Sequence, residues 1–183
     1  MERSQKERVL AGELHMANNS ELASDHLRAH DLLARFNATQ ATKEAERREL
    51  LKQLLGSFGE GAVLRPTLRC DYGYNISIGA HTFVNYDCVL LDCNTIGQED
   101  QTAPGAHIYT ATHPLDAATH QSGAEYALPV RIANGAWIGG GSIICPGVII
   151  GENTVVGASS VVAKDPSPDV LAAGHPARMI RTY

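Results

Sequence analysis

Aromatic residues are scarce in this sequence of 183 residues: they make up 5% of the chain, against 44% for hydrophobic residues as a whole. A core must therefore be built from small and branched aliphatic side chains. Long apolar runs are missing as well. No stretch approaches the roughly 18 consecutive apolar residues of a membrane-spanning helix, and the charged first residues lack the apolar segment of a signal peptide. We expect one cytoplasmic domain with a small appendage and no membrane partner.

An excess of positive charge and paired cysteines are also missing. The formal net charge of −5 argues against nucleic acid as a partner, although a local basic patch could still hold a phosphorylated ligand. The four cysteines are Cys70, Cys88, Cys93 and Cys145. Their spacing fits neither a zinc ribbon nor a CxxC redox site, so we expect reduced thiols that act as small packing residues.

What the chain does contain is a repeat of six residues. In its C-terminal part every sixth residue is aliphatic, at Ile132, Ile138, Ile144, Ile150, Val156 and Val162. An earlier segment shows the same rhythm at Ile78, Val84, Leu90 and Ile96, weakens at Thr102 and returns at Ile108. Neither a helix nor a single strand keeps one face apolar at this spacing. The pattern predicts short strands joined by tight turns, in which three units close a triangular coil around the aliphatic side chains.

The remaining segments are expected to close the ends of the stack of coils. Residues 1–58 should form a helical segment, because Leu22, His26, Ala29, Leu33 and Phe36 recur at helical spacing and a second helix is indicated over Thr42 to Leu55. Residues 59–183 should form the coil domain, with a tail at 165–183. The stretch 113–129 lacks the repeat, and a loop of that length is usually functional or disordered.

Several motifs resemble one known family. They are "AGEL" (11–14), "NYDCVLLD" (85–92), "APGAHIYTATHPLD" (103–116), "WIGGG" (137–141) and "GHPARMI" (174–180). Together they resemble the maltose, galactoside and nodulation-sugar O-acetyltransferases, which are hexapeptide-repeat acyltransferases, and most of all the maltose branch. The resemblance implies a left-handed parallel β-helix and a homotrimer with active sites between its subunits. It also implies acetyl-CoA as co-substrate, a maltose-, glucose- or galactoside-like acceptor, and no metal.

"TATHP" (110–114) contains the residue with the clearest chemical role. By resemblance, His113 is the general base, and the loop that it opens extends towards a neighbouring subunit. An acetyl thioester is already activated, so no covalent intermediate is needed. An imidazole, with an ordinary pKa of about 6.5, can take the proton of a sugar hydroxyl and return it to the departing thiolate. Pro114 restricts the backbone of His113 to extended conformations.

Four further residues are expected around the reacting groups, and three of them, Asn85, Asp71 and Asp92, match family positions. Asn85 is expected to stabilise the reacting centre by donating a hydrogen bond. Asp71 and Asp92 are expected to accept hydrogen bonds from the hydroxyls of the acceptor sugar. Glu125, or a backbone carbonyl of the 113–129 loop, is expected to hold the second nitrogen of the His113 ring.

The positions that match the coenzyme A site of the family are Trp137, Gly140, Ala158, Ala163, Lys164, Arg178 and Arg181. The small residues would border the pantetheine arm, and the three basic residues would face the nucleotide phosphates. Trp137 could equally be a core residue or a contact between subunits.

Two features depart from the family pattern. Some relatives place Asp and Arg on the N-terminal helices to contact the sugar, where this chain has Ala17 and His26. The segment 90–102 is two residues shorter, which leaves Leu90 and Ile96 six residues apart, so a bulge is expected to be missing there. Asp100 and Thr102 then fall on inward positions, and either the coil is loosened or its register shifts.

Other functions remain open at this point. A γ-type carbonic anhydrase shares the β-helix and binds zinc through three histidines, for which His81, His107 and His113 are the candidates. Because His107 and His113 are six residues apart, they should lie on adjacent sides of the coil and diverge. A xenobiotic acetyltransferase, a serine acetyltransferase and a non-catalytic scaffold are further alternatives.

Overall fold

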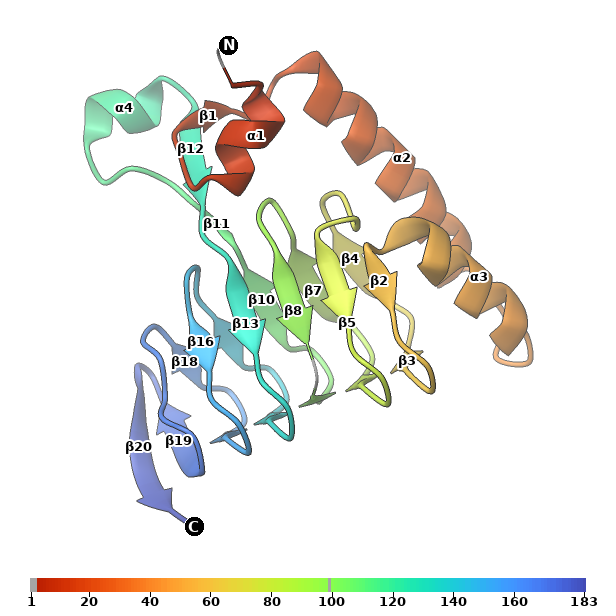
Figure 1. The fold of residues 1–183 in the computed structure, drawn as a ribbon, viewed down its shortest axis with the longest axis vertical. Coiled ribbons are helices and arrows are strands. Elements are labelled where there is room, and N and C mark those ends of the chain that lie inside the picture. The colour runs from red at the N-terminus through yellow and green to blue at the C-terminus, as the bar shows by residue number, and fades with distance from the viewer. Residues whose placement is uncertain (1–2, 99) are drawn as a thin grey trace.

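The computed structural model describes residues 3–98 and 100–183. Three helices come first, α1 (Gln5–Leu10), α2 (Ser20–Asn37) and α3 (Glu44–Leu54), and a stack of short strands follows them (Figure 1). A short fourth helix, α4 (Ala117–Gln121), lies in the loop that interrupts the stack. None of these helices has both the length and the apolar composition that crossing a membrane requires.

The stacked strands form three sheets, which we call the first, second and third side. The first side contains β2 (Ser57–Phe58), β5 (Ile76–Ile78), β8 (Ile96–Gln98), β13 (Val130–Ile132) and β16 (Ile149–Ile150). The second contains β4 (Leu68–Cys70), β7 (Cys88–Leu91), β10 (His107–Tyr109), β15 (Ile143–Ile144) and β18 (Val161–Val162). The third contains β3 (Val63–Leu64), β6 (Phe83–Val84), β9 (Gln101–Thr102), β14 (Trp137–Ile138), β17 (Val155–Val156), β19 (Val170–Gly174) and β20 (Ala177–Thr182).

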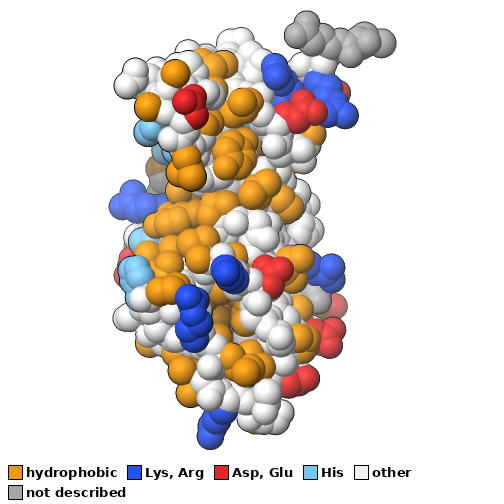
Figure 2. All heavy atoms as spheres, turned by 90° about the vertical axis from the view of Figure 1, so that its left-hand side faces the viewer, with side chains coloured by type: hydrophobic (Ala, Val, Ile, Leu, Met, Phe, Trp, Pro, Cys, Tyr) orange, Lys and Arg blue, Asp and Glu red, His pale blue; other side chains and the backbone are white. Residues whose placement is uncertain are grey.

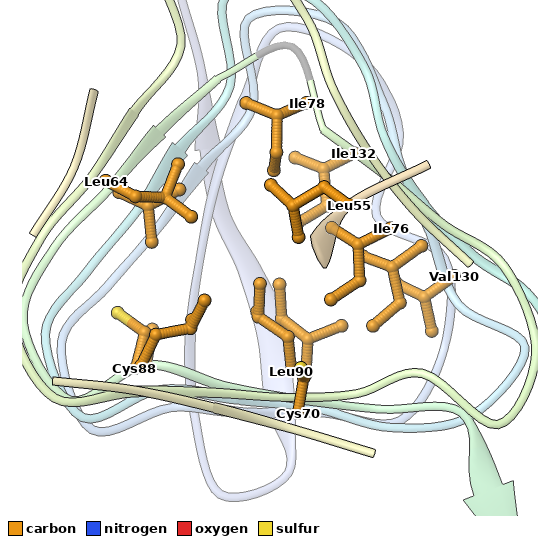
Figure 3. Close-up of a cluster of buried hydrophobic side chains, with 14 of the residues drawn as sticks. Leu55, Leu64, Cys70, Ile76, Ile78, Cys88, Leu90, Val130 and Ile132 are labelled. Atoms are coloured by element: carbon orange, nitrogen blue, oxygen red, sulfur yellow. The ribbon is translucent and has the colours of Figure 1, made fainter. Parts of the chain in front are cut away.

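The core is the interior of this three-sided prism. Figure 3 shows side chains from all three sides pointing inward, among them Leu64, Ile78, Leu90 and Ile132. Each of these four is at most 3% exposed. Strands within a side are parallel, except that β20 runs antiparallel to β19. The β-helix predicted from the repeat of six is therefore confirmed.

The corners of the prism require unusual backbone conformations. Gly135 has φ +74°, and a side chain there would place its Cβ 2.5 Å from Oδ1 of Asn153 in the next coil. Non-glycine residues take the same left-handed conformation at other corners, for example His81 (φ 59°) and Asn153 (φ 53°). Small residues are therefore favoured at the corners for two reasons: neighbouring coils stack closely there, and the backbone has a positive φ.

The N-terminal helices cover one end of the stack. Leu22, Ala29, Leu33 and Phe36 of α2 are buried, as their helical spacing predicts, whereas His26 is only half-buried. Asn37 then pins the end of α2 to the β-helix, because its side chain donates to the carbonyl of Leu68 and accepts from the amide of Leu68, both at 2.9 Å. The β19–β20 hairpin lies at the opposite end (Figure 1).

The shortened coil differs from the expectation. Ile96 pairs with Ile76 and Val130, and Gln98 takes the register position of Ile78 and Ile132. β8 ends at Gln98 and β9 begins at Gln101, whereas the stacked corners 79–82 and 133–136 contain four residues each.

The two missing residues therefore belong to the corner after β8. The expectation that Leu90 and Ile96 keep one unbroken six-residue register is wrong, because Leu90 is eight residues from Gln98 whereas the paired positions Ile144 and Ile150 are six residues apart. Thr102 stays in register with Val84 and Ile138, so Thr102 and Asp100 both enter the interior.

Candidate functional site

The histidine of "TATHP" lies in a loop that the N-terminal segment helps to hold. After β10 the chain forms β11 (Ala111–Thr112), α4 and β12 (Ala124–Ala127). β12 pairs antiparallel with β11 and also with β1 (His15–Met16), so a three-stranded sheet stands beside the β-helix (Figure 1). His113 follows β11 directly, and its side chain is 53% exposed.

Glu125 lies between two histidines. Its Oε2 is 3.8 Å from Nε2 of His113, and its Oε1 is 3.3 Å from Nε2 of His15. The sequence indicated Glu125 as a partner of His113, and the structure brings the two together. The sequence contained no indication that His15 belongs to the site, because its position is set by a strand of two residues that pairs with a segment far along the chain.

Asp92 is placed differently from the expected contact with an acceptor. Its side chain is fully buried. Oδ1 accepts hydrogen bonds from the backbone amides of Asp71 (3.0 Å) and Tyr72 (2.9 Å), and Oδ2 accepts one from Asn75 (3.2 Å). Burial raises the pKa of Asp92 to about 7, although its bonds to backbone amides act in the opposite direction. Asp92 thus organises the turn that carries Asp71.

Asp71 is the carboxylate that this turn presents. It is only partly buried, and burial raises its pKa above the ordinary value while the Cys93 thiol, which donates to Oδ2 at 3.4 Å, lowers it. His26, one of the two replaced positions, acts electrostatically on Asp71 and so lies near the same carboxylate. Ala17, the other replaced position, falls just after β1.

Two tyrosines that were not predicted as site residues lie next to Asp71 in the motif "DYGYN" (71–75). The rings of Tyr72 and Tyr74 stack with centroids 5.6 Å apart, and His26 meets the Tyr72 ring edge-on at 6.3 Å. Tyr72 is buried and Lys6 covers the Tyr74 ring, so the pair supports the turn that carries Asp71.

Within one chain, Asn85 does not lie next to His113. It precedes β7, whereas Asp92 follows β7. β10, from which the His113 loop departs, is parallel to β7, so Asn85 and His113 belong to opposite edges of the second side. The Asn85 carbonyl oxygen Oδ1 accepts from the amide of Tyr86 at 2.9 Å, which fixes the side chain at its corner.

The residues expected around coenzyme A divide into groups. Gly140 and Ala158 share the corner column of Asn85, where the amide of Ser159 donates to the carbonyl of Gly140 at 2.9 Å. Ala163 and Lys164 follow β18, at the edge from which the His113 loop departs. Trp137 on β14, and Arg178 and Arg181 on β20, belong to the third side and are partly or well exposed.

A groove lies elsewhere, over the outer face of the first side. Its volume is about 640 Å³, and its lining includes Gly97, Leu128, Arg131 and Ile149. None of the residues expected in the active site lines it. No described atom comes within 4 Å of the place where a Gly97 side chain would be, which contributes to the hollow.

The three histidines of the zinc hypothesis fall in different places. His81 lies at a corner between the first and third sides, His107 on β10 of the second side, and His113 in the loop. Within residues 3–98 and 100–183, no three His, Cys, Asp or Glu side chains are grouped to hold a metal ion.

Comparison with known proteins gives consistent matches over the whole chain. The family description "Maltose acetyltransferase hexapeptide capping motif" matches residues 8–59, and "Bacterial transferase hexapeptide (six repeats)" matches residues 129–164. Nodulation protein L of Rhizobium meliloti (strain 1021) is 47% identical over 98% of this chain and 99% of its own length.

Two crystal structures are similar throughout. A maltose O-acetyltransferase from Clostridium difficile 630 has a TM-score of 0.96 and 43% identity, covering 98% of this chain and 97% of that one. A galactoside acetyltransferase in complex with coenzyme A has a TM-score of 0.93 and 34% identity, covering 99% and 92%.

Proposed function

The chain belongs to the hexapeptide-repeat acetyltransferases, the family of the maltose, galactoside and nodulation protein L proteins, and on that premise we propose that it transfers an acetyl group from acetyl-CoA to a sugar hydroxyl. The observation that carries the proposal is the placement of His113, half exposed at the end of β11, with Glu125 3.8 Å from its Nε2.

In the proposed reaction His113 acts as general base. It takes the proton of the acceptor hydroxyl as the oxygen attacks the thioester carbonyl carbon, and a tetrahedral intermediate forms. The carbon–sulfur bond then breaks, and the imidazolium returns the proton to the coenzyme A thiolate. Such proton transfer contributes typically about 10²–10⁴-fold to the rate, and positioning of the two substrates adds to it.

The state of the cysteines supports direct transfer without an acyl-enzyme. A cysteine nucleophile must be a thiolate, and it is activated by a lowered pKa. Here burial raises the pKa of Cys88 to about 11 and raises the pKa of Cys70, Cys93 and Cys145 as well. All four thiols are therefore poor nucleophiles at neutral pH.

Asp71 is the proposed acceptor contact, because its carboxylate can accept hydrogen bonds from neighbouring sugar hydroxyls. Tyr72 is only 6% exposed and stacks on Tyr74, whose ring also lies beneath the Lys6 ammonium, so the two rings support the Asp71 turn. Asp92 acts indirectly by holding the Asp71 turn. His26, which acts electrostatically on Asp71, is proposed to give the chain a different group near the acceptor from relatives that have arginine there.

The site is proposed to lie between subunits of a homotrimer. Asn85 and His113 are at opposite edges of the second side, so one catalytic centre can contain both only if they come from two chains. Figure 2 shows hydrophobic side chains gathered in a band across the middle of one face, with Lys and Arg side chains beside it. Such a band suits a surface that another subunit covers.

Coenzyme A is proposed to bind along the coils near the C-terminal end. Gly140 and Ala158 would border the pantetheine arm on the Asn85 corner, and Ala163 would do so on the neighbouring edge. Lys164, Arg178 and Arg181 supply cations for the nucleotide phosphates, and Trp137 offers an exposed ring nearby.

The activity is tested by release of free thiol from acetyl-CoA across a panel of mono- and disaccharides, with antibiotic alcohols and serine included. His113→Ala should lower turnover on the preferred sugar by about 10²–10⁴-fold while the circular dichroism spectrum stays unchanged. His81→Asn is a matched control, because His81 is exposed at a distant corner and Asn tolerates its left-handed φ of 59°. Full turnover in His113→Ala would remove the general base from the proposal, and exclusive acetylation of antibiotics or serine would replace the sugar acceptor.

Subunit mixing tests the shared site. Asn85→Ala and His113→Ala are each expected to be nearly inactive. In mixed trimers roughly one quarter of the interfaces would combine an intact Asn85 with an intact His113, so mixing under exchange conditions should restore that fraction of wild-type activity. No recovery in trimers shown to be mixed by mass spectrometry would mean that both residues act within one chain or that Asn85 is not needed.

A further inference from the structure

Three titratable side chains form a row across the sheet of β1, β12 and β11. The register places His15 opposite Glu125. It also places Thr112, at the end of β11, opposite Tyr126, and His113 is the next residue along the chain. Directly opposed residues on neighbouring antiparallel strands point to the same face. Backbone pairing therefore brings His15 and Glu125 together, and the end of the β11 ladder brings His113 to the other side of Glu125, 3.8 Å away.

The row runs from the interior to the surface. The side chain of His15 is 1% exposed, that of Glu125 is 15% exposed, and that of His113 is 53% exposed. The inner contact is the shorter one, 3.3 Å from His15 Nε2 to Glu125 Oε1, against 3.8 Å from His113 Nε2 to Oε2. Glu125 is therefore held from the inside and presents its other oxygen to His113.

Both nitrogens of the His15 ring face oxygens that only accept hydrogen bonds. Nδ1 is 3.3 Å from the backbone carbonyl of Glu13, and Nε2 faces the carboxylate of Glu125. A neutral imidazole has one N–H, so it can serve only one of these acceptors. Donation from Nε2 to the Glu125 carboxylate is the contact that fixes this oxygen, because a hydrogen bond to a charged acceptor is stronger than one to the neutral carbonyl of Glu13.

We propose that His15 is a positioning residue for acetyl transfer, which fixes the carboxylate of Glu125 so that its free oxygen faces His113. This inference rests on the proposed function, in which His113 is the base. Without His15, Glu125 would be a largely buried carboxylate with no fixed partner, and the group that faces His113 would lose its orientation.

Other titratable groups face this row. Asp71, Tyr72 and Cys93 on the β-helix interact electrostatically with Glu125, and the ring of His120 on α4 lies 5.3 Å from that of His113. Glu125 raises the pKa of Asp71, because two negative charges repel.

The first test does not depend on turnover. In the ¹⁵N spectrum of histidine-labelled protein, Nε2 of His15 should carry a proton, and Glu125→Gln should shift the resonance of that nitrogen. An Nε2 without a proton in the wild-type protein would overturn the proposal, because such a ring cannot donate to Glu125. If the wild type transfers no acetyl group to any acceptor, the proposed function fails, while this spectrum still tests the link between His15 and Glu125.

The second test is kinetic. His15→Phe keeps the ring volume but cannot donate a hydrogen bond, and it should lower kcat roughly tenfold or more while KM for acetyl-CoA changes less than twofold. His15→Gln should recover part of the loss, because its amide can still donate to Glu125. Adding Glu125→Gln to His15→Phe should cause little further loss, since both act through one contact.

His81→Asn again serves as the control. Wild-type kcat in a folded His15→Phe variant, or fully additive losses in the double variant, would show that His15 is only a packing residue. If His15→Phe does not fold, the smaller His15→Ala variant decides, because it also lacks a hydrogen-bond donor and a kcat equal to that of the wild type would overturn the proposal.

Discussion

The coil formed by β13, β14 and β15 and the coil formed by β7, β8 and β9 have the same three-sided plan but bury different side chains. The former, the regular coil, has Ile132, Ile138 and Ile144 in its interior with small residues beside them. The latter, the short coil, also buries four polar side chains: Asp92, Asn94, Asp100 and Thr102. The regular coil is filled by aliphatic side chains. The short coil has polar side chains in part of its interior, and these hold the turn and the loop of the proposed site.

The polar groups of the short coil differ in how well they are satisfied. Asn94 donates to the carbonyls of Val9 (3.0 Å) and Ala127 (2.9 Å), which ties α1 and the His113 loop to the coil. Asp100 accepts from the Thr102 hydroxyl at 2.7 Å, but its Oδ1 has no hydrogen-bond partner among the described residues. Burying a polar group is favourable only when it is bonded, so Asp100 is the weak point of the coil.

The largest expected effect comes from removing the carboxylate of Asp92. Asp92→Ala would leave the amides of Asp71, Tyr72 and Asn75 without their acceptor, at a cost of about 3–5 kcal/mol in the free energy of unfolding. Asp92→Asn keeps an oxygen at the Oδ1 position and should cost less. Urea denaturation at fixed protein concentration measures both. A loss under about 1 kcal/mol for the alanine variant would show that the turn does not depend on Asp92.

Converting the short coil towards the regular one should stabilise it in a pH-dependent manner. Burial raises the pKa of Asp100 from 3.8 to about 7, despite its bond to Thr102. The unfolded chain therefore ionises first, and the folded state loses stability as the pH rises from about 4 to about 7.

The variant that tests this is Asp100→Ala combined with Thr102→Val, because the regular coil has Ala136 and Ile138 at these places. It should gain about 4 kcal/mol at pH 8 and less than half of that at pH 5. Urea denaturation at the two pH values gives the difference. An equal gain at both would mean that Asp100 is not protonated on folding.

The smallest effect is expected in the regular coil itself. Ser142 is fully buried and donates to the carbonyl of Gly157 at 3.0 Å. Ser142→Ala should cost only about 1 kcal/mol, because one neutral hydrogen bond is lost and the small side chain still fits the corner. Ser24→Ala, exposed on α2, is the control and should change the free energy of unfolding by less than about 0.5 kcal/mol. A cost for Ser142→Ala comparable to that of Asp92→Ala would remove the distinction between the two coils.

The regular coil was predictable residue by residue, because the spacing of Ile132, Ile138 and Ile144 directly reports which side chains point inward. The short coil was not. Leu90 and Ile96 are six residues apart, but strand pairing shows two irregularities. The connection before Ile96 is longer than in the regular coil and the one after Gln98 is shorter, so the number of residues from Leu90 to Thr102 is unchanged. A sequence records the sum of the two changes and not their positions.

The site was predictable in its residue types rather than in their partners. His113 and Glu125 were found, because both belong to one loop. His15 was not, because a strand of two residues gives no periodic signal and its partner is far along the chain. Asp92 was assigned to the acceptor, since nothing in a sequence separates a carboxylate that faces a ligand from one that is capped by backbone amides.

The pairing of β1 with β12 also has a consequence for biosynthesis. His15 emerges from the ribosome well before Glu125, its cross-strand partner. At synthesis rates of about 5–20 residues per second, the first strand waits on the order of ten seconds for the segment that it pairs with. The loop that carries His113 is therefore completed only when the N-terminal strand β1 pairs with the newly synthesised β12. A chain released before residue 125 has neither this pairing nor the contact between His15 and Glu125.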